Sequence, residues 1–362
     1  MKHHNSSSFK SPNDSTGSNI TINKDTLLLH ANNLISTPEI EKVNNNFFTL
    51  MPANSWIERA KTKPIPQMLF GEFWFEGELC ILFSDTNLGK SILGVQIGDS
   101  ISKGIAISGF KLEANKQPIL YYDFELSEKQ FEERYSMQYT NHYNFDNNFI
   151  RVEINKDAEI PDNIPIDDFL YQSLEQNIVE TGSKILIIDN ITYLKDDNEK
   201  AKDALPLMKY LKSIKSKYNL SILVLAHTPK RDLSKPISKN DLSGSKMLMN
   251  FCDTSFSIGE SSKDNAIRYL KQIKQRNTEQ IYNSENVCVC QIEKPSNFLH
   301  FHFLSLGKEN EHLHSASAKE KENQLKRVIE LNQLGKSLRE IGSEIGISHM
   351  KVHRMLNNCN TL

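Results

Sequence analysis

The stretch that most constrains this sequence is a short apolar segment, Leu79–Phe83, followed by a polar loop that ends in Gly89, Lys90 and Ser91. An apolar-periodic segment, Ile92–Ile101, comes directly after the loop. This order predicts a strand, a tight turn and a helix, so that backbone N–H groups of the turn and of the helix N-terminus face one anion. The pattern is typical of a phosphate-binding loop, and the alternative is a chance Gly-Lys-Ser at a helix start.

The side chains of the loop have separate expected roles. Lys90 is expected to reach the β- and γ-phosphates of ATP, and the Ser91 hydroxyl to bind Mg²⁺. The usual motif opens with glycine, but here Ser84 stands there, which requires a negative φ at that residue. Asn87 tolerates a left-handed conformation and is expected to carry part of the turn. The nucleotide-binding candidates are Ser84, Asp85, Thr86, Asn87, Leu88, Gly89, Lys90 and Ser91.

Length and composition allow one large domain and a small one. The chain has 362 residues and a net charge of −2, so any nucleic-acid contact must rest on a local basic patch. The five cysteines form no Cys-x-x-Cys pair with histidine partners, so we expect reduced thiols and buried small side chains. No apolar run approaches roughly 20 residues, which predicts a cytoplasmic protein without a membrane partner.

The pattern along the chain changes three times. Residues 1–45 are rich in Ser, Asn, Thr and Lys and are expected to be a disordered tail. Residues 46–306 are expected to form the main domain, with Trp56–Phe75 packing as a lead-in against the first strand. Residues 307–322 are polar and are predicted to be a linker, and residues 323–358 show a compact helical pattern.

The main domain alternates continuous apolar runs with helical patterns such as Asp203–Lys217. Continuous runs indicate strands buried on both faces, which favours an α/β fold with a doubly wound, mostly parallel sheet. Three later runs read as antiparallel strands at one edge. The predicted strands are Leu79–Phe83, Ile119–Phe124, Lys184–Ile188, Ser221–Ala226, Thr254–Ile258, Ile267–Ile273, Asn286–Ile292 and Phe298–Leu304.

Polar residues follow several of the predicted parallel strands. Asp189 ends one of them and is expected to hold Mg²⁺ beside the phosphate loop. Glu125 follows another strand and is expected to polarise the attacking water, although Asp123 is a rival and a helix-capping role for Glu125 is open. His227 ends a third strand, where it either senses the γ-phosphate or is structural. Carboxyl ends of parallel strands meet at one edge, which brings these groups together.

Lys274 and Arg276 lie two residues apart near the end of a predicted edge strand. On a strand they point the same way, and two such cations are suited to stabilise the charge of a transferring phosphoryl group. In a ring they would act on the nucleotide of a neighbouring subunit. The alternative is that these charges only protect an exposed sheet edge.

This ordered set resembles the RecA-like P-loop ATPases, in particular the hexameric replicative helicases of the plasmid RepA type and their relatives on mobile elements. The resemblance covers about Trp56 to Leu306. It implies phosphate and Mg²⁺ binding by the loop and Asp189, catalysis by Glu125, sensing by His227, and fingers at Lys274 and Arg276. It also implies DNA-contacting loops at a central channel, for which the basic candidates are Lys230, Arg231, Lys235, Lys239 and Lys246.

The C-terminal segment has the pattern of a helix-turn-helix. Ser337 and Glu340 form a capping box, Gly342 is small where two helices cross, and Gly346 supplies a left-handed turn residue. Ser348 is placed to cap the second helix. The exposed positions of that helix predict contacts to duplex DNA by His349, Met350, Lys351, His353 and Arg354. The alternative is a small helical cap for protein contacts.

These patterns predict an ATP-hydrolysing, DNA-binding protein with ATP and Mg²⁺ as ligands. The first hypothesis is a homo-oligomeric ring that acts as a helicase or translocase, binding single strands through its loops and duplex through its C-terminus. The second is a nucleotide-switched DNA-binding regulator that moves nothing. The third is an accessory ATPase of recombination.

Overall fold

The computed structural model describes residues 48–191, 204–229, 231–242, 245–314 and 316–359. The predicted N-terminal tail, residues 1–45, lies outside these ranges. The chain divides into two compact units, residues 1–64 and 65–362. The first unit contains helix α2, Ala53–Lys61, which has no buried residue. Trp56, at which the expected lead-in begins, belongs to this helix and is 44% exposed. The second unit begins at Ile65 and contains the sheet.

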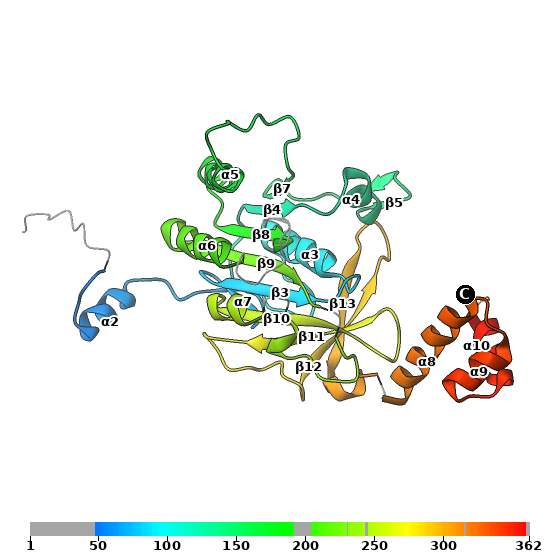
Figure 1. Ribbon diagram of the computed structural model, residues 1–362. Helices are drawn as coiled ribbons and strands as arrows, with labels where there is room; N and C mark the ends of the chain where they lie inside the picture. Colours follow the sequence, from blue (N-terminus) through cyan, green and yellow to red (C-terminus); the bar gives the residue numbers. More distant parts are fainter. Residues whose placement is uncertain (1–47, 192–203, 230, 243–244, 315, 360–362) are drawn as a thin grey trace, which may run out of the picture. The chain divides into compact units, whose positions relative to one another are not determined.

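A nine-stranded sheet organises the second unit (Figure 1). Its order is β13-β12-β11-β10-β3-β9-β8-β4-β7, in which the six strands from β10 to β7 are parallel and β11 to β13 are antiparallel. This confirms the predicted α/β class with antiparallel C-terminal strands. The strands are β3 Leu79–Ser84, β4 Ile119–Asp123, β7 Phe149–Val152, β8 Ile185–Asp189, β9 Ser221–His227, β10 Thr254–Glu260, β11 Ile267–Lys274, β12 Val287–Glu293 and β13 His300–Gly307.

Both faces of the central parallel strands are buried, which is why these strands read as continuous apolar runs. Alternate residues of β3 enter two different cores, because successive side chains of a strand point to opposite faces. Leu79, Ile81 and Phe83 pack with helices α5, Ile166–Thr181, and α6, Ala204–Tyr218. Cys80 and Leu82 pack with helix α3, Lys90–Lys103. The phosphate-loop helix and α6 therefore cover opposite faces of one sheet.

Several short elements complete the unit and were not predicted. A small hairpin, β1 and β2, buries Phe70, Phe73 and Trp74 against the α3 face of the sheet, so the second half of the expected lead-in does pack there. Strand β7 and helix α5 were not predicted either, because their sequences have no clear apolar periodicity. The short elements are β1 Met68–Phe70, β2 Trp74–Phe75, α4 Glu128–Arg134, β5 Ser136–Met137, β6 Asn141–His142, η2 Lys239–Asp241 and α7 Ser245–Phe251.

The predicted linker, residues 307–322, is more structured than expected. A 3-10 turn, η3 Glu309–Glu311, follows β13, and the Glu309 carboxylate is buried in an ion pair with Lys271 at 2.6 Å. Helix α8, Ala316–Gln333, begins seven residues before the predicted boundary at 323. Alanine, lysine and glutamate in this stretch are strong helix formers, so high polarity there does not mean an open chain.

Three helices form the C-terminal segment: α8, α9 Leu338–Ile345 and α10 His349–Cys359. They share a small core that includes Val328, Leu331, Ile341 and Val352. The capping box of Ser337 and Glu340 is present, and Gly346 adopts φ 73° between α9 and α10. A Cβ on Gly342 would lie 2.6 Å from the Ile347 carbonyl oxygen. The predicted turn chemistry of this segment is thus confirmed.

Within the described ranges no helix combines the length and apolarity that crossing a lipid bilayer requires.

Candidate active site

The loop after β3 has the strained turn that phosphate binding needs. Asn87 adopts φ 62° and Gly89 adopts φ 96°, so the predicted left-handed role of Asn87 is confirmed. Ser84 is not among the residues with positive φ, as a serine in place of the first glycine requires. A Cβ on Gly89 would lie 2.9 Å from Ile292 and from Phe301. Gly89 is therefore required both by its conformation and by the hairpin packed against it.

Lys90 opens α3 and turns its ammonium back over the loop. Nζ donates to the carbonyl oxygens of Ser84, at 3.1 Å, and Asp85, at 3.0 Å, and lies 3.1 Å from Nδ1 of His227. The side chain is buried, which lowers the pKa of the ammonium, while the negative charges of Asp189, Glu125 and Asp85 oppose that shift. Three acceptors thus hold the Lys90 ammonium at the mouth of the loop.

Asp189 ends β8 on the same side as Ser91, and the pair fits a magnesium ion. Asp189 is fully buried, and Oδ2 accepts a hydrogen bond from the Tyr121 hydroxyl at 2.7 Å. Burial raises the pKa of Asp189 to about 6, opposed by the nearby hydroxyls of Ser91 and Tyr121. Oδ1 is buried and makes no hydrogen bond of acceptable geometry. A buried carboxylate oxygen beside a serine hydroxyl offers the hard oxygen ligands that Mg²⁺ prefers.

Glu125, His227 and Asn190 meet above Lys90. Oε1 of Glu125 lies 3.2 Å from Nε2 of His227 and accepts a hydrogen bond from the Asn190 amide. A lysine ammonium can only donate, so His227 Nδ1 accepts from Lys90, while Nε2 of the ring faces Glu125 and lies 3.0 Å from Nδ2 of Asn190. The hydrogen bond from His227 lowers the pKa of Glu125, which favours its carboxylate form. Glu125 therefore does not cap α4; Ser127 does, by accepting from Gln130 N–H.

Asp123, the alternative candidate to Glu125, uses both oxygens of its carboxylate in structural contacts. Its Oδ1 accepts from the N–H groups of Glu125, at 3.2 Å, and Leu126, at 2.9 Å. Its Oδ2 pairs with Nε of Arg151, on β7, at 2.9 Å. Asp123 thus shapes the turn that presents Glu125, and the geometry favours Glu125 as the group that faces a phosphate.

The comparisons with known proteins place this site in a family. A family model described as an AAA domain matches residues 48–232, just over half of the chain. The chain belongs to the AAA domain family. Among solved structures, a KaiC-like protein from the hyperthermophilic archaeon Pyrococcus horikoshii OT3 is similar, at 14% identity and a TM-score of 0.42, over 63% of this chain and 91% of that one. That likeness concerns the general fold alone. No curated protein matches the sequence.

The AAA domain match agrees with the observed phosphate loop and sheet. The match includes Lys90, Glu125, Asp189 and His227. All four are predicted from the sequence, whereas Tyr121 and Asn190, which contact Asp189 and Glu125, and Arg151, which pairs with Asp123, are not. Asn190 directly follows Asp189, and Tyr121 shares a strand with Asp123, so their positions carried a usable signal. Arg151 carried none, because its strand was not predicted.

Lys274 and Arg276 lie beyond the AAA domain match and away from the phosphate loop of their own chain. Lys274 pairs in register with Ser255, near the start of β10, whereas the loop leaves the opposite end of the sheet at Ser84. Nζ of Lys274 donates to the carbonyl oxygens of Met249 and, at 2.7 Å, Cys252. Arg276, just past the end of β11, lies 3.3 Å from Asp253. Both cations thus engage the segment before β10, and a single chain does not bring them to its own phosphates.

The candidate DNA-binding loop is firmly anchored, and one of its residues is buried. Lys230 and the side chain of Lys246 lie outside the described residues. Arg231 was expected to contact DNA, but its side chain is 7% exposed, with Nε 3.8 Å from Asp241, so its guanidinium supports the loop instead. Lys235 and Lys239 are exposed as expected. Buried Glu309 accepts from the backbone N–H of Ile237 at 2.7 Å, which ties the loop to η3.

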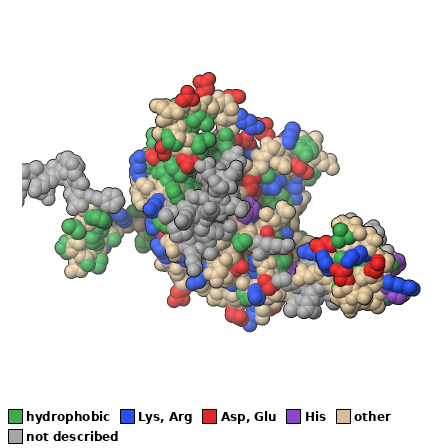
Figure 2. All heavy atoms as spheres, viewed as in Figure 1, with side chains coloured by type: hydrophobic (Ala, Val, Ile, Leu, Met, Phe, Trp, Pro, Cys, Tyr) green, Lys and Arg blue, Asp and Glu red, His purple; other side chains and the backbone are tan. Residues whose placement is uncertain are grey.

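The C-terminal helices of the AAA protein present the predicted surface. The second helix of the motif, α10, exposes every position expected to face DNA, namely His349, Met350, Lys351, His353 and Arg354. Figure 2 shows blue, red and purple side chains close together on these helices, so cations there lie among carboxylates. Arg327 and Lys336 both pair with Glu344, at 3.1 Å for Arg327.

Proposed function

We propose that this AAA protein is an ATP-driven DNA motor, a ring-forming helicase or translocase that serves the replication or mobilisation of a mobile element. One observation carries the proposal: His227 connects the phosphate-loop lysine to the carboxylate of Glu125. A phosphate that takes over the Lys90 ammonium removes a hydrogen bond from His227. The imidazole that faces Glu125 is thereby sensitive to whether nucleotide is bound.

Within this proposal the residues divide the work. The loop from Ser84 to Ser91 and Lys90 bind the phosphates of ATP, and Ser91 and Asp189 hold Mg²⁺, which neutralises charge on the phosphates when it is bound. Glu125 orients the water that attacks the γ-phosphate. Lys274 and Arg276 of one subunit complete the site of the next. Their position at the far end of the sheet supports this, because they have no phosphate to contact within their own chain.

The DNA contacts are assigned to two regions. Lys235 and Lys239 extend from the anchored loop and are proposed to contact phosphates of a single strand, together with Lys230 and Lys246, whose side chains lie outside the described residues. Such contacts are independent of base sequence and weaken steeply with salt. The second helix of the C-terminal motif is proposed to read duplex DNA through Lys351 and Arg354, with His349 and His353 beside them.

A second candidate function is a DNA-binding regulator whose assembly ATP controls. The well-capped α9 and α10 favour it, since a sequence-reading module is useful to a regulator that moves nothing. A recombination ATPase is a third candidate, with the same catalytic site. The structure of the site is common to all three.

The deciding experiment measures ATP turnover with and without single-stranded DNA, alongside strand displacement on a forked duplex. A motor is expected to be stimulated by single strands and to displace the strand only with hydrolysable ATP. Sequence-specific duplex binding that ATP changes, without stimulation or displacement, would favour the regulator. Absence of turnover under every condition would contradict an ATPase.

A further inference from the structure

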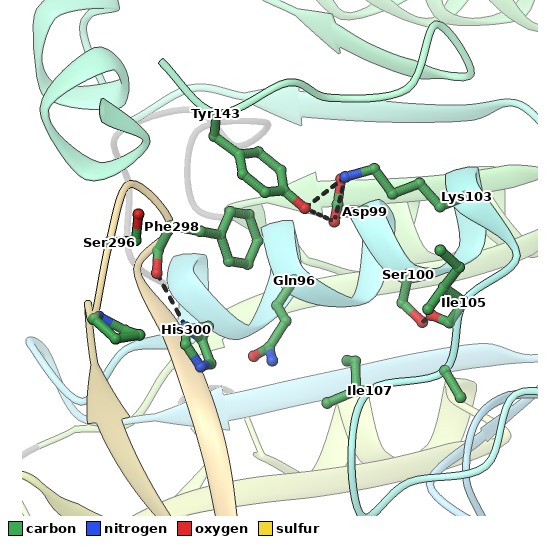
Figure 3. A pocket seen from close by; sticks show the side chains of 12 residues that line it. Gln96, Asp99, Ser100, Lys103, Ile105, Ile107, Tyr143, Ser296, Phe298 and His300 are labelled. Carbon is green, nitrogen blue, oxygen red and sulfur yellow. Dashed lines mark hydrogen bonds and ion pairs between the residues drawn. The ribbon is translucent and has the colours of Figure 1, made fainter. Parts of the chain in front are cut away.

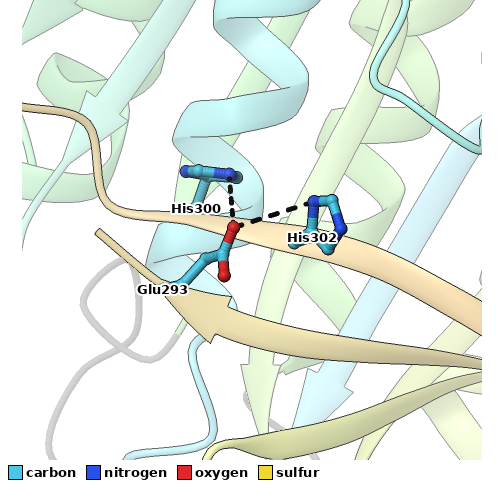
Figure 4. Close-up of side chains that lie close together, drawn as sticks. All are labelled: Glu293, His300 and His302. Carbon is cyan, nitrogen blue, oxygen red and sulfur yellow. Dashed lines mark ion pairs between the residues drawn. The ribbon is translucent and has the colours of Figure 1, made fainter. Parts of the chain in front are cut away.

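A cluster of one glutamate and two histidines lies on the last two strands of the sheet, outside the proposed nucleotide site (Figure 4). In the register of β12 and β13, Glu293 pairs with His300, and Gln291 pairs with His302. His300 and His302 are two residues apart on β13, so their rings lie on one face of the strand. Glu293 therefore has one histidine directly opposite and the other on the diagonal, both within reach of its carboxylate.

The spacing of the three groups is that of metal ligands rather than of hydrogen-bonded partners. Oε1 of Glu293 lies 3.6 Å from Nε2 of His300 and 3.7 Å from Nδ1 of His302, both longer than a normal hydrogen bond. All three ligand atoms lie within 4.8 Å of one another. Bonds of about 2.0–2.1 Å in a tetrahedral zinc site place neighbouring ligand atoms roughly 3.4 Å apart. A small rotation of each side chain brings all three atoms to one ion.

His300 is also held in the tautomer that a metal needs. Its Nδ1 lies 3.0 Å from the carbonyl oxygen of Phe298, which can only accept, so Nδ1 carries the proton. Figure 3 shows this hydrogen bond at the edge of a pocket of about 330 Å³ that runs along α3. The lone pair of Nε2 then points toward Glu293. An imidazole oriented by a backbone carbonyl through its second nitrogen is the usual arrangement around protein-bound zinc.

We propose that Glu293, His300 and His302 form a site for a divalent transition-metal ion of the zinc type. The donor set of two imidazoles and one carboxylate suits Zn²⁺ and is unlike the all-oxygen set that suits Mg²⁺. The His302 side chain is 47% exposed, which leaves a fourth position open to water. The ion joins the end of β12 to the start of β13.

The Glu293, His300 and His302 cluster lies on one face of the β12–β13 hairpin, and the opposite face of this hairpin packs against the phosphate loop. Ile292 precedes Glu293, Phe301 stands between the two histidines, and both side chains reach the space beside Gly89. The backbone of Phe301 also exchanges two hydrogen bonds with the Gln96 side chain of α3, at 2.9 and 3.0 Å. Metal binding at this site therefore stiffens the hairpin that packs against the loop. This effect does not depend on whether the protein is a DNA motor or a regulator.

The test is calorimetric titration of Zn²⁺ into the nucleotide-free full-length chain in which His3, His4 and His30 are replaced by Ala and Cys359 by Ser. These changes remove the histidines and the cysteine whose side chains lie outside the described residues. The four cysteines whose side chains are described are buried and do not compete. We expect one saturable Zn²⁺ per chain and a rise in melting temperature. His302→Ala and Glu293→Gln should each weaken binding at least tenfold while the fold, followed by circular dichroism, is kept.

A matched control is His314→Ala, which removes a histidine that faces Glu260 at 3.2 Å in a two-residue pair. It should leave Zn²⁺ binding unchanged. Co²⁺ in place of Zn²⁺ should give a visible absorption band that His302→Ala abolishes. Either the lack of saturable binding in the background chain, or binding that survives both His302→Ala and Glu293→Gln, would overturn the proposal.

Discussion

Nδ1 of His227 lies 3.1 Å from the Lys90 ammonium, while the Nε2 of the same ring lies 3.2 Å from Glu125. One imidazole thus connects a phosphate-binding cation to the carboxylate assigned to the attacking water. Because an ammonium has no lone pair, Nδ1 of His227 is the acceptor in its contact with Lys90.

The first prediction separates phosphate binding from hydrolysis. Lys90→Ala should weaken ATP binding roughly ten- to hundredfold, as expected for loss of hydrogen bonds to a charged group at about 1.5–3 kcal/mol. Glu125→Gln should keep binding and lower turnover by about 10²–10⁴, the usual contribution of a positioned base. Binding of a fluorescent ATP analogue and release of phosphate measure the two effects. Normal turnover by Glu125→Gln would remove Glu125 from this role, and Asp123 would be tested next.

A second prediction concerns sites shared between subunits. Arg276→Ala should leave nucleotide affinity near normal and depress turnover, because a finger acts on charge that develops during transfer. Mixing it with Glu125→Gln should restore part of the activity, since about one interface in four is complete in a randomly mixed ring. Mixing it instead with the double variant Glu125→Gln/Arg276→Ala supplies no intact pair and is the control. Equal turnover in the two mixtures would argue against a shared site.

The third prediction concerns the C-terminal helices. Replacing Lys351 and Arg354 together with Ala should abolish duplex binding and leave basal ATP hydrolysis intact, since base-edge contacts are worth about 1–3 kcal/mol for each good pair. Lys336→Ala is the matched control, because that lysine already pairs with Glu344. Selection of the full chain against random duplexes reads out the preference. A selection that enriches no sequence, with no duplex retained at low salt, would leave these helices as a protein-contact module.

The fourth prediction is a pH dependence of stability. Burial raises the pKa of Glu78 from 4.5 to about 7. The folded chain therefore binds more protons than the unfolded chain between these values, and the free energy of unfolding falls as pH rises from about 4.5 to 7. The full effect of Glu78 is about 3 kcal/mol. Asp189, with a pKa of about 6, adds a loss of the same sign between 3.8 and 6.

Urea denaturation at pH 5 and at pH 7.5 measures this term. Lowered pKa values of other carboxylates act in the opposite direction, so the informative quantity is the difference between the parent chain and Glu78→Gln. That variant should lose stability less than the parent as pH rises. Glu279→Gln, at an exposed position in the same region, should behave like the parent. Identical pH profiles for Glu78→Gln and the parent would contradict the assignment.

The sequence predicted the sheet and the phosphate loop well because local signals set them. Apolar runs, the Gly-Lys-Ser turn and the capping box of Ser337 need only neighbours along the chain. It favoured Glu125 and left Asp123 as an alternative, because the contact that occupies Asp123 is made by Arg151, on an edge strand with little apolar signal. Arg231 looked like an exposed loop cation, yet its side chain is only 7% exposed and lies beside Asp241.

The Glu293, His300 and His302 cluster illustrates the same limit for a binding site. Two histidines with one residue between them are visible in the sequence, but their relation to Glu293 depends on the register of β12 with β13. A slip of one residue would move the carboxylate to the other face of the sheet. The boundary between the two units at Pro64 could likewise not be predicted from the sequence, because the pattern does not reveal that helix α2 has no buried residue.

The placement of Arg276 at the end of the sheet remote from the phosphate loop also restricts symmetry. A two-fold dimer can bring the cation end of one chain onto the loop end of the other only if both contacts lie in one self-complementary interface, and such a dimer contains two complete sites and stops there. A head-to-tail assembly instead makes one such contact between each pair of neighbours, and it either closes into a ring or grows into a helix. A closed ring has as many complete sites as chains, whereas an open assembly always has one fewer.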